Sequence, residues 1–157
     1  EQLKIQGVLT KSVSCNILTP VFVATEKATL ASSYASNQVI RFNDHYASLK
    51  IERGEYLRIT RVSQYSNRII LQKENGERVI WRPDKTASHK IEVFQEKARE
   101  LCEGESVVFM RSMKTQGVVK GERCQIEILQ AGRATLRDAS GMTFSIDLSK
   151  PDNRHLD

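Results

Sequence analysis

The feature that most constrains this chain is an internal repeat, in which residues 39–62 resemble residues 108–129. Apolar residues, glycines and glutamates recur at an offset of 67 positions, which becomes 65 after a loop that is two residues shorter. Such a recurrence predicts one supersecondary unit that occurs twice. The matched pairs are Phe42 with Phe109, Gly54 with Gly121, Glu55 with Glu122, Ile59 with Ile126, Leu71 with Leu136, Gly76 with Gly141, Trp81 with Ile146 and Lys85 with Lys150.

Each copy has the residue pattern of β-strands. Apolar and polar residues alternate over 57–60 and over 124–127, as in a strand with one buried face. Asn75-Gly76 and Ser140-Gly141 predict tight hairpins, because such turns need positive backbone φ angles. After these turns, the residues expected to face inward are Val79 and Trp81 in the first copy and Phe144 and Ile146 in the second.

Short strands around an aliphatic core fit a small SH3-like or OB-like barrel, an architecture that leaves few exposed strand edges. We therefore predict a mainly β fold with two such barrels in tandem, a short N-terminal helix and minor helical turns. Residues 1–36 are expected to supply a strand (Val13–Leu18) and a short helix (Thr25–Ala31). The first barrel is expected at 37–88 and the second at 89–157.

The junction between the barrels is expected within Pro83–Ser88. Beyond it, the alternation in Ile91–Phe94 predicts a strand, and Glu96–Leu101 is compatible with one helical turn. In the N-terminal part, Thr25 is the expected N-cap of the short helix.

Positive charge is concentrated in the first part of the chain. The whole sequence carries 24 Lys+Arg and 19 Asp+Glu, but residues 1–88 hold 13 against 8 and residues 89–157 hold 11 of each. Most of the excess is arginine, which pairs with phosphates and stacks on bases. Two interpretations stay open, a solvated arginine-rich sheet face and a polyanion-binding face.

The sequence contains none of the motifs expected of an enzyme. No GxxxxGKS/T phosphate loop and no GxSxG nucleophile elbow is present. A transmembrane helix is not expected either, because the sequence has no run of 18 apolar residues. We expect no cofactor, no metal site and, in a reducing cytoplasm, no disulfide. The three cysteines, which could form disulfides or bind metal, are expected to be small apolar residues of the core: Cys15, Cys102 and Cys124. The three histidines, which could bind metal, are expected on the surface or in loops: His45, His89 and His155.

Each copy also has a cationic loop, Arg41–Gly54 and Arg111–Gly121, that closes on a glycine followed by glutamate. A glycine there allows a tight return of the chain, and a cationic loop tip can follow a phosphate backbone. Tyr46, Tyr56 and Tyr65 could stack on bases, although we favour packing in the core or against a hairpin for each of them.

Three segments, 31–62, 100–129 and 145–157, resemble conjugative relaxase-helicases of the TraI/TrwC type, and the match extends from about Val21 to Asp157. The second copy is similar to the barrel that RecD-like superfamily 1 helicases insert in their second motor domain, where a basic loop and a glycine precede the strands as at Gly121. An Arg-Asn-Asp-like triplet of the family is replaced here by Arg111-Ser112-Met113.

The resemblance implies what these residues do. Such proteins nick and carry one plasmid strand, unwind DNA and are exported by a type IV secretion system. In these proteins a pair of inserted barrels, called the 2B-like and 2B parts, lies over single-stranded DNA and acts as an internal translocation signal. The resemblance implies the same role for this chain. The implied partners are single-stranded DNA, the secretion coupling protein and the motor domains of the same chain, with no membrane insertion and a monomeric state.

The resemblance also implies that this is a fragment of a longer protein, with a helicase motif expected just beyond Asp157. The parent protein would be a relaxase and ATP-dependent helicase, located in the donor cytoplasm and exported to the recipient. The relaxase tyrosines, the metal-binding histidines and the motor motifs of the family have no counterparts here. The chain by itself is therefore expected to be catalytically silent.

We predict that DNA or a partner protein contacts ten residues. A protein-interaction scaffold without nucleic-acid binding is the alternative, and a nuclease or other enzyme is a third possibility that the missing motifs oppose. The predicted contacts are Arg41, Arg58, Arg61, Arg78, Trp81 and Arg82 in the first barrel and Arg111, Lys114, Lys120 and Arg123 in the second.

Overall fold

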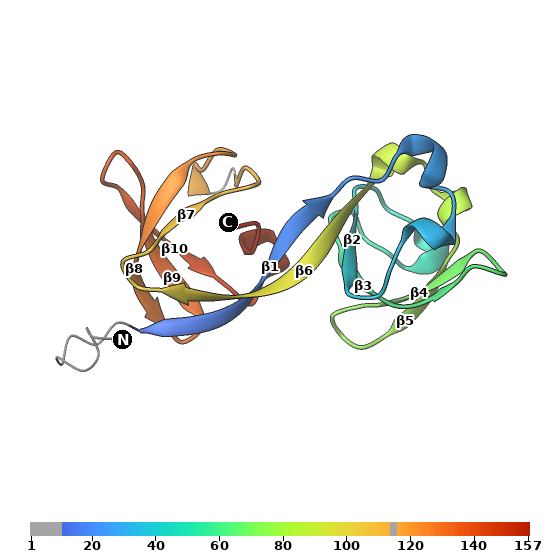
Figure 1. Ribbon diagram of the computed structural model, residues 1–157, viewed down its shortest axis with the longest axis horizontal. Coiled ribbons are helices and arrows are strands. Elements are labelled where there is room, and N and C mark those ends of the chain that lie inside the picture. The colour runs from blue at the N-terminus through green and yellow to red at the C-terminus, as the bar shows by residue number, and fades with distance from the viewer. Residues whose placement is uncertain (1–10, 114–115) are drawn as a thin grey trace. The chain divides into compact units, whose positions relative to one another are not determined.

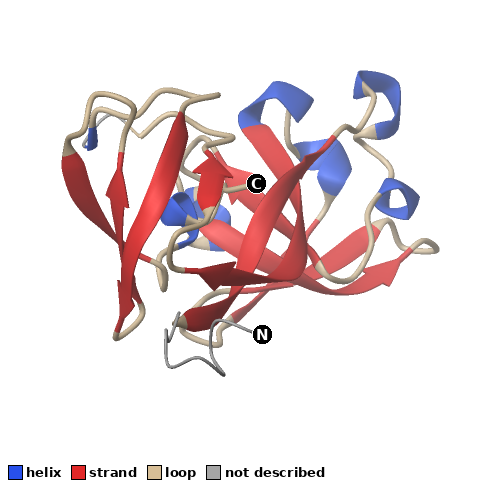
Figure 2. Ribbon diagram, turned by 60° about the vertical axis from the view of Figure 1, so that its left-hand side comes forward, coloured by secondary structure: helices blue, strands red, loops and turns tan. Residues whose placement is uncertain are grey.

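The computed structural model describes residues 11–113 and 116–157, and this part of the chain is mainly β. Figure 2 shows that the helices are short turns between strands. The helices are η1 (Thr25–Lys27), η2 (Ala31–Ser33), η3 (Ala47–Leu49), η4 (Pro83–Lys85), η5 (Ser88–Lys90) and η7 (Pro151–Asn153). The strands are β1 (Ser12–Val21), β2 (Gln38–Phe42), β3 (Tyr56–Ser63), β4 (Arg68–Gln72), β5 (Arg78–Trp81), β6 (Ile91–Cys102), β7 (Ser106–Val108), β8 (Arg123–Gln130), β9 (Arg133–Arg137) and β10 (Thr143–Asp147).

The strands form two antiparallel sheets. One has the order β1-β6-β2-β3-β4-β5, and the other has the order β10-β9-β8-β7. Consecutive hairpins build β3-β4-β5 and β8-β9-β10, and both sets can be followed in Figure 1. The predicted turns are present, since Gly76 and Gly141 both have a φ of 91° and join the last two strands of their set.

The two copies of the repeat have the same local structure. The register shifts at Ile59/Arg61 in β3 and at Ile126/Ile128 in β8, so each copy has the same β-bulge. Equivalent backbone hydrogen bonds have equal lengths, with Gly54 N–H donating to the Phe42 carbonyl at 2.7 Å and Gly121 N–H donating to the Phe109 carbonyl at 2.7 Å.

Positive backbone angles recur at the same places. Asn37 (φ 79°) corresponds to Gly104 (φ 89°), and Lys50 (φ 56°) corresponds to Gly117 (φ 70°). Glycine reaches such angles without strain, and asparagine tolerates them better than most residues. The backbone path is therefore kept in both copies even where the residue type differs.

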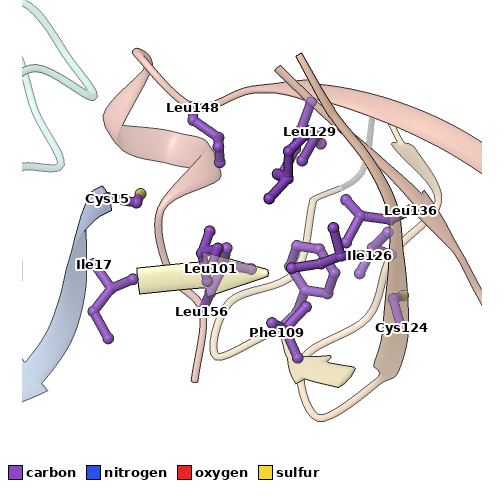
Figure 3. Close-up of a cluster of buried hydrophobic side chains, with 14 of the residues drawn as sticks. Cys15, Ile17, Leu101, Phe109, Cys124, Ile126, Leu129, Leu136, Leu148 and Leu156 are labelled. Carbon is purple, nitrogen blue, oxygen red and sulfur yellow. The ribbon is translucent and has the colours of Figure 1, made fainter. Parts of the chain in front are cut away.

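Each copy has its own hydrophobic core. In one, Phe42, Leu57, Ile59, Leu71 and Trp81 are buried together. The other core is drawn in Figure 3, where Phe109, Ile126 and Leu136 of the second copy lie in one cluster with Cys15 and Ile17 of β1 and Leu101 of β6.

The chain forms two compact units. Unit 2 is the continuous segment Pro20–Glu96, whereas unit 1 combines the described residues up to Thr19 with Lys97–Asp157. The boundaries predicted from the sequence lie after residues 36 and 88. The units divide elsewhere because β1 and β6 each contribute residues to both of them.

Two local predictions are corrected by the structure. Glu96–Leu101 is part of the long strand β6 and not a helical turn. The helix expected over Thr25–Ala31 is a 3-10 turn at Thr25–Lys27, followed by a second turn at Ala31–Ser33, and Ala24 rather than Thr25 precedes the first, without a side-chain cap. The strand predicted at Val13–Leu18 is confirmed as part of β1.

No helix in the described part of the chain is long and apolar enough to cross a membrane.

Candidate nucleic-acid interface

The outer face of β3, β4 and β5 in unit 2 carries arginines. Leu57, Ile59, Ile69, Leu71, Val79 and Trp81 point into the core of this unit, so the residues that alternate with them point outward. We call the outward set the arginine face, and it consists of Arg58, Arg61, Arg68, Ile70, Gln72, Arg78 and Ile80.

Strand register brings these side chains next to one another. Arg58 pairs with Gln72, and Gln72 pairs in turn with Arg78, which gives one row across the three strands. Directly opposite residues on one face have Cβ atoms about 4.5–5.5 Å apart. The row therefore holds two guanidinium groups with one amide between them.

The next row has a different composition. The β-bulge turns Arg61 outward to pair with Ile70, and Ile70 pairs with Ile80, which is 59% exposed. Arg68 begins β4 opposite Ser63 and is exposed. The arginines thus surround a small apolar centre.

Three of the four arginines on this face are available to a ligand. Arg61, Arg68 and Arg78 form no ion pair with any residue that the structure describes. Arg58 is different, since its Nε and Nη2 donate to the two carboxylate oxygens of Glu96 at 3.0 and 2.7 Å. A bidentate pair of this kind must open before Arg58 can bind a phosphate.

Two further predicted contacts in unit 2 have internal partners. Arg41 donates to Asn43, lies 3.5 Å from a carboxylate oxygen of Glu92, and its guanidinium covers the ring of Tyr56 at 5.7 Å from the centroid. Arg82 is exposed and pairs with Asp84 at 3.4 Å. Arg41 therefore mainly stabilises the fold.

The prediction that Trp81 contacts a partner is wrong. Its side chain is fully buried, its Nε1 donates to the Thr86 hydroxyl at 3.0 Å, and its ring makes edge contacts with Tyr34 and Phe42. Tryptophan Nε1 usually finds a hydrogen-bond acceptor when the ring is buried, as Thr86 provides here.

The contacts predicted in the second copy are not gathered on a sheet face. Arg111 follows β7 and is half-buried, and Lys120 is exposed in the segment before β8. Arg123 is exposed at the start of β8, opposite Val108. Lys114 lies outside the described residues.

The sheet face of unit 1 that corresponds to the arginine face lacks an arginine at three of the four equivalent positions. Gln125 stands in the place of Arg58, Ile128 in that of Arg61 and Thr143 in that of Arg78. Arg137 is bound by Glu127, and this hydrogen bond holds the pKa of the Glu127 carboxyl below its ordinary value. Of the four arginine positions, only that of Arg68 is also an arginine in unit 1, where Arg133 forms no ion pair with the described residues and its Nε donates to the Ser145 hydroxyl at 3.3 Å. The cluster of three arginines without ion pairs is therefore found in unit 2 alone among the described residues.

The three tyrosines considered for base stacking have different environments. Tyr46 packs edge-on against Phe42 in the core, and Tyr56 lies beneath Arg41. Tyr65 is fully exposed in the turn between β3 and β4, next to the arginine face. Packing is confirmed for the first two, whereas Tyr65 is free to contact a ligand.

The predicted contacts omitted Arg68, although this residue belongs to the arginine excess in the first part of the chain. Arg68 begins the segment Arg-Ile-Ile-Leu, in which the apolar run hides the alternation that would have placed this arginine on the outer face. The signal that could have found it is the repeat, because Arg133 occupies the same position in the second copy.

Titratable groups elsewhere are mostly structural. His155 lies outside the helices and strands, as expected of a loop residue, but it is 2% exposed and therefore is not on the surface. Burial raises the pKa of Cys15, and it raises the pKa of Cys124 to about 11. Within residues 11–113 and 116–157, no group of three or more His, Cys, Asp or Glu side chains is placed to hold a metal ion.

No family model fits the chain, and no curated protein is significantly similar to it.

Proposed function

We propose that this chain is a non-catalytic module of a conjugative relaxase-helicase that contacts single-stranded DNA and serves as a translocation signal for a type IV secretion system. The resemblance of three sequence segments to that family motivates the proposal. The observation that carries its DNA-binding part is the arginine face, where Arg61, Arg68 and Arg78 lack carboxylate partners among the described residues.

The proposal includes the finer architecture. Unit 2 is the 2B-like part and unit 1 the 2B part, each a small SH3-like or OB-like barrel. The shared β-bulge supports this assignment, because a bulge increases strand twist and lets a small sheet curl. The coupling protein and the motor domains of the parent protein would be its protein partners, in the donor cytoplasm and during export.

Salt dependence tests the DNA contact. Each phosphate neutralised on a single strand contributes about −0.7 to the slope of log affinity against log salt. Three arginines therefore give a slope of about −2, which fluorescence anisotropy with a labelled oligothymidine would measure. Arg61→Gln and Arg78→Gln should each make the slope shallower by about 0.7.

A matched control separates this face from general charge. Arg137→Gln removes an arginine from the corresponding face of unit 1, where Glu127 already binds it, and should leave the slope unchanged. Absence of binding, or a slope that is the same for all four proteins, would contradict the proposed DNA contact.

A transfer assay tests the secretion part. The chain fused to a reporter should pass to recipient cells, and Ile80→Asp or Ile128→Asp should abolish transfer if exposed apolar residues on the outer faces are read by the secretion machinery. Far-UV circular dichroism would show that both variants are folded. Undiminished transfer of both folded variants would remove these faces from the signal.

A protein-interaction scaffold is the second candidate, and the exposed Ile80 within the arginine face favours it. An apolar centre with a cationic rim would suit an acidic peptide with one apolar anchor. Under this alternative a glutamate-rich peptide containing leucine would compete with oligothymidine for binding. Ile80→Ser would then lower the affinity for the peptide far more than the affinity for the DNA.

A further inference from the structure

The two copies differ most sharply at one corner of the arginine face. The turn between β3 and β4 comprises residues 64–67, whereas the corresponding turn between β8 and β9 comprises residues 131–132. The longer turn adds Tyr65, whose side chain is fully exposed. The same copy has Arg61 where the other has Ile128.

The base of this turn is firmly anchored. Asn67 has a positive φ of 51°, and its Oδ1 accepts the backbone N–H of Ala31 at 2.6 Å. Its Nδ2 donates to the carbonyl of Thr29 at 3.0 Å and to Oδ1 of Asp84 at 3.3 Å. Tyr65 therefore projects from a fixed support, which lowers the entropy that binding would cost.

Positive charge lies on both strands that lead into the turn. Arg61 precedes it on β3 and Arg68 follows it on β4, and both are exposed without an ion pair to the described residues. An exposed aromatic ring on the turn, with a free guanidinium group on each of the two strands that the turn joins, matches the alternation of bases and phosphates along a single strand. A protein partner would gain less from this arrangement, because the turn offers no apolar neighbour for the ring.

We propose that Tyr65 stacks on one unpaired base while Arg61 and Arg68 bind the adjoining phosphates, so that this corner selects single-stranded over double-stranded nucleic acid. The inference rests on the proposed function and deepens it. Selection follows because bases in a duplex are already stacked on each other and must be extruded, at a cost, before a side chain can stack on them.

The test compares Tyr65→Ala, Tyr65→Phe and the wild-type chain on labelled oligothymidine and on a blunt duplex. Loss of the ring should weaken single-strand binding by about 5- to 150-fold, the range for one base stacked on an aromatic side chain. Tyr65→Phe should retain most of the affinity, and duplex binding should change in neither variant. Phe22→Ala is the matched control, since Phe22 is a 90% exposed aromatic of the same unit outside the arginine face.

Abasic oligonucleotides separate stacking from charge. On a strand with phosphates but no bases, wild type and Tyr65→Ala should bind equally, and Tyr65→Ala should keep the wild-type salt slope, whereas Arg61→Gln and Arg68→Gln should each reduce it by about 0.7. Equal affinity of wild type and Tyr65→Ala for oligothymidine, with a normal slope, overturns the stacking and leaves the proposed function standing. Absence of DNA binding by the wild type overturns both.

Discussion

The indole of Trp81 lies between the edges of Tyr34 and Phe42, with ring centroids at 5.3 and 5.6 Å, and its Nε1 donates to Thr86 at 3.0 Å. Thr86 is itself one of few buried polar residues. A buried N–H without an acceptor costs the desolvation free energy of that group. One hydroxyl therefore allows a tryptophan to occupy the centre of unit 2.

Replacement of this hydroxyl should destabilise unit 2. Thr86→Val keeps the side-chain shape but removes the acceptor of Trp81, and should lower the free energy of unfolding by about 1–3 kcal/mol. Thr86→Ser retains the hydroxyl and loses only a methyl group, which should lower the free energy of unfolding by about 0.8 kcal/mol. Trp81 is the single tryptophan, so its fluorescence during urea unfolding reports this unit. A valine variant as stable as the serine variant would contradict the role of the hydrogen bond.

Asp138 has a comparable role in the turn between β9 and β10. Its Oδ1 accepts hydrogen bonds from the Ser140 hydroxyl at 2.6 Å and from the backbone N–H groups of Ser140 and Met142 at 2.9 and 3.0 Å. The Ser140 hydroxyl is the largest cause that holds the pKa of the Asp138 carboxyl below its ordinary value, and the backbone N–H groups add to it.

This lowered pKa predicts an acid-sensitive turn. Because the carboxyl is more acidic in the folded than in the unfolded chain, its stabilisation is present above the unfolded pKa of about 3.9 and is lost as the pH falls through the folded pKa. Asp138→Asn should lower the melting temperature at pH 7 and make it fall less steeply below about pH 4. Circular dichroism melts across this range would measure both effects, and an unchanged acid dependence would contradict the assignment.

At the scale of elements, the repeat keeps backbone angles more strictly than residue types. Asn37 and Gly104 occupy equivalent positions with φ of 79° and 89°, each just before a strand that begins its copy. A Cβ at Gly104 would meet no atom within 4 Å, so only the backbone angle restricts the residue there.

Exchange of this residue between copies is a direct test. Gly104→Asn introduces the residue that unit 2 tolerates and should change the free energy of unfolding little. Gly104→Val should cost about 1–3 kcal/mol, because a β-branched side chain is strained at positive φ. Urea unfolding followed by far-UV circular dichroism would compare them. Equal losses in both variants would mean that asparagine is strained at this backbone angle as much as valine, and that the position requires glycine.

Elements with a local signal could be predicted from the sequence. Alternation placed the core residues of β3 and β8, and Asn75-Gly76 and Ser140-Gly141 placed the hairpins. Glu96–Leu101 was misassigned because its residues suit a helix, whereas pairing within the sheet extends β6 through it. Propensity is a weak guide where long-range pairing decides the structure.

The candidate site was predicted less completely than the fold. Arg61 and Arg78 lie on the proposed face, but the same reasoning included Trp81, which is buried, and omitted Arg68. A pattern of period two states which residues share a face, yet it does not show which charges are neutralised. The pairing of Arg58 with Glu96, 38 positions away, depends on the register of strands that only the structure gives.

At the scale of the whole molecule, unit 2 is one continuous segment, whereas unit 1 is assembled from two segments that flank it in sequence. Each unit has a separate cluster of buried residues. The last residues of unit 1 and the first residue of β6 make equivalent contacts. Leu156 forms an antiparallel bridge with Phe109, just as Ile91 pairs with Phe42 in unit 2. In each copy, the chain that follows the hairpins thus pairs with the equivalent phenylalanine.

Separate cores predict that damage to one unit stays local. Leu136 is fully buried in unit 1, and Leu136→Ala should cost about 2–5 kcal/mol through lost burial and the cavity left behind. Hydrogen exchange with peptide resolution should then accelerate across β8 and β9 of unit 1, while β3 to β5 of unit 2 keep their wild-type protection. Ile69→Ala, in the core of unit 2, is the reciprocal control and should reverse the pattern. Equal acceleration of both units by either substitution would mean that the two cores unfold as one cooperative structure.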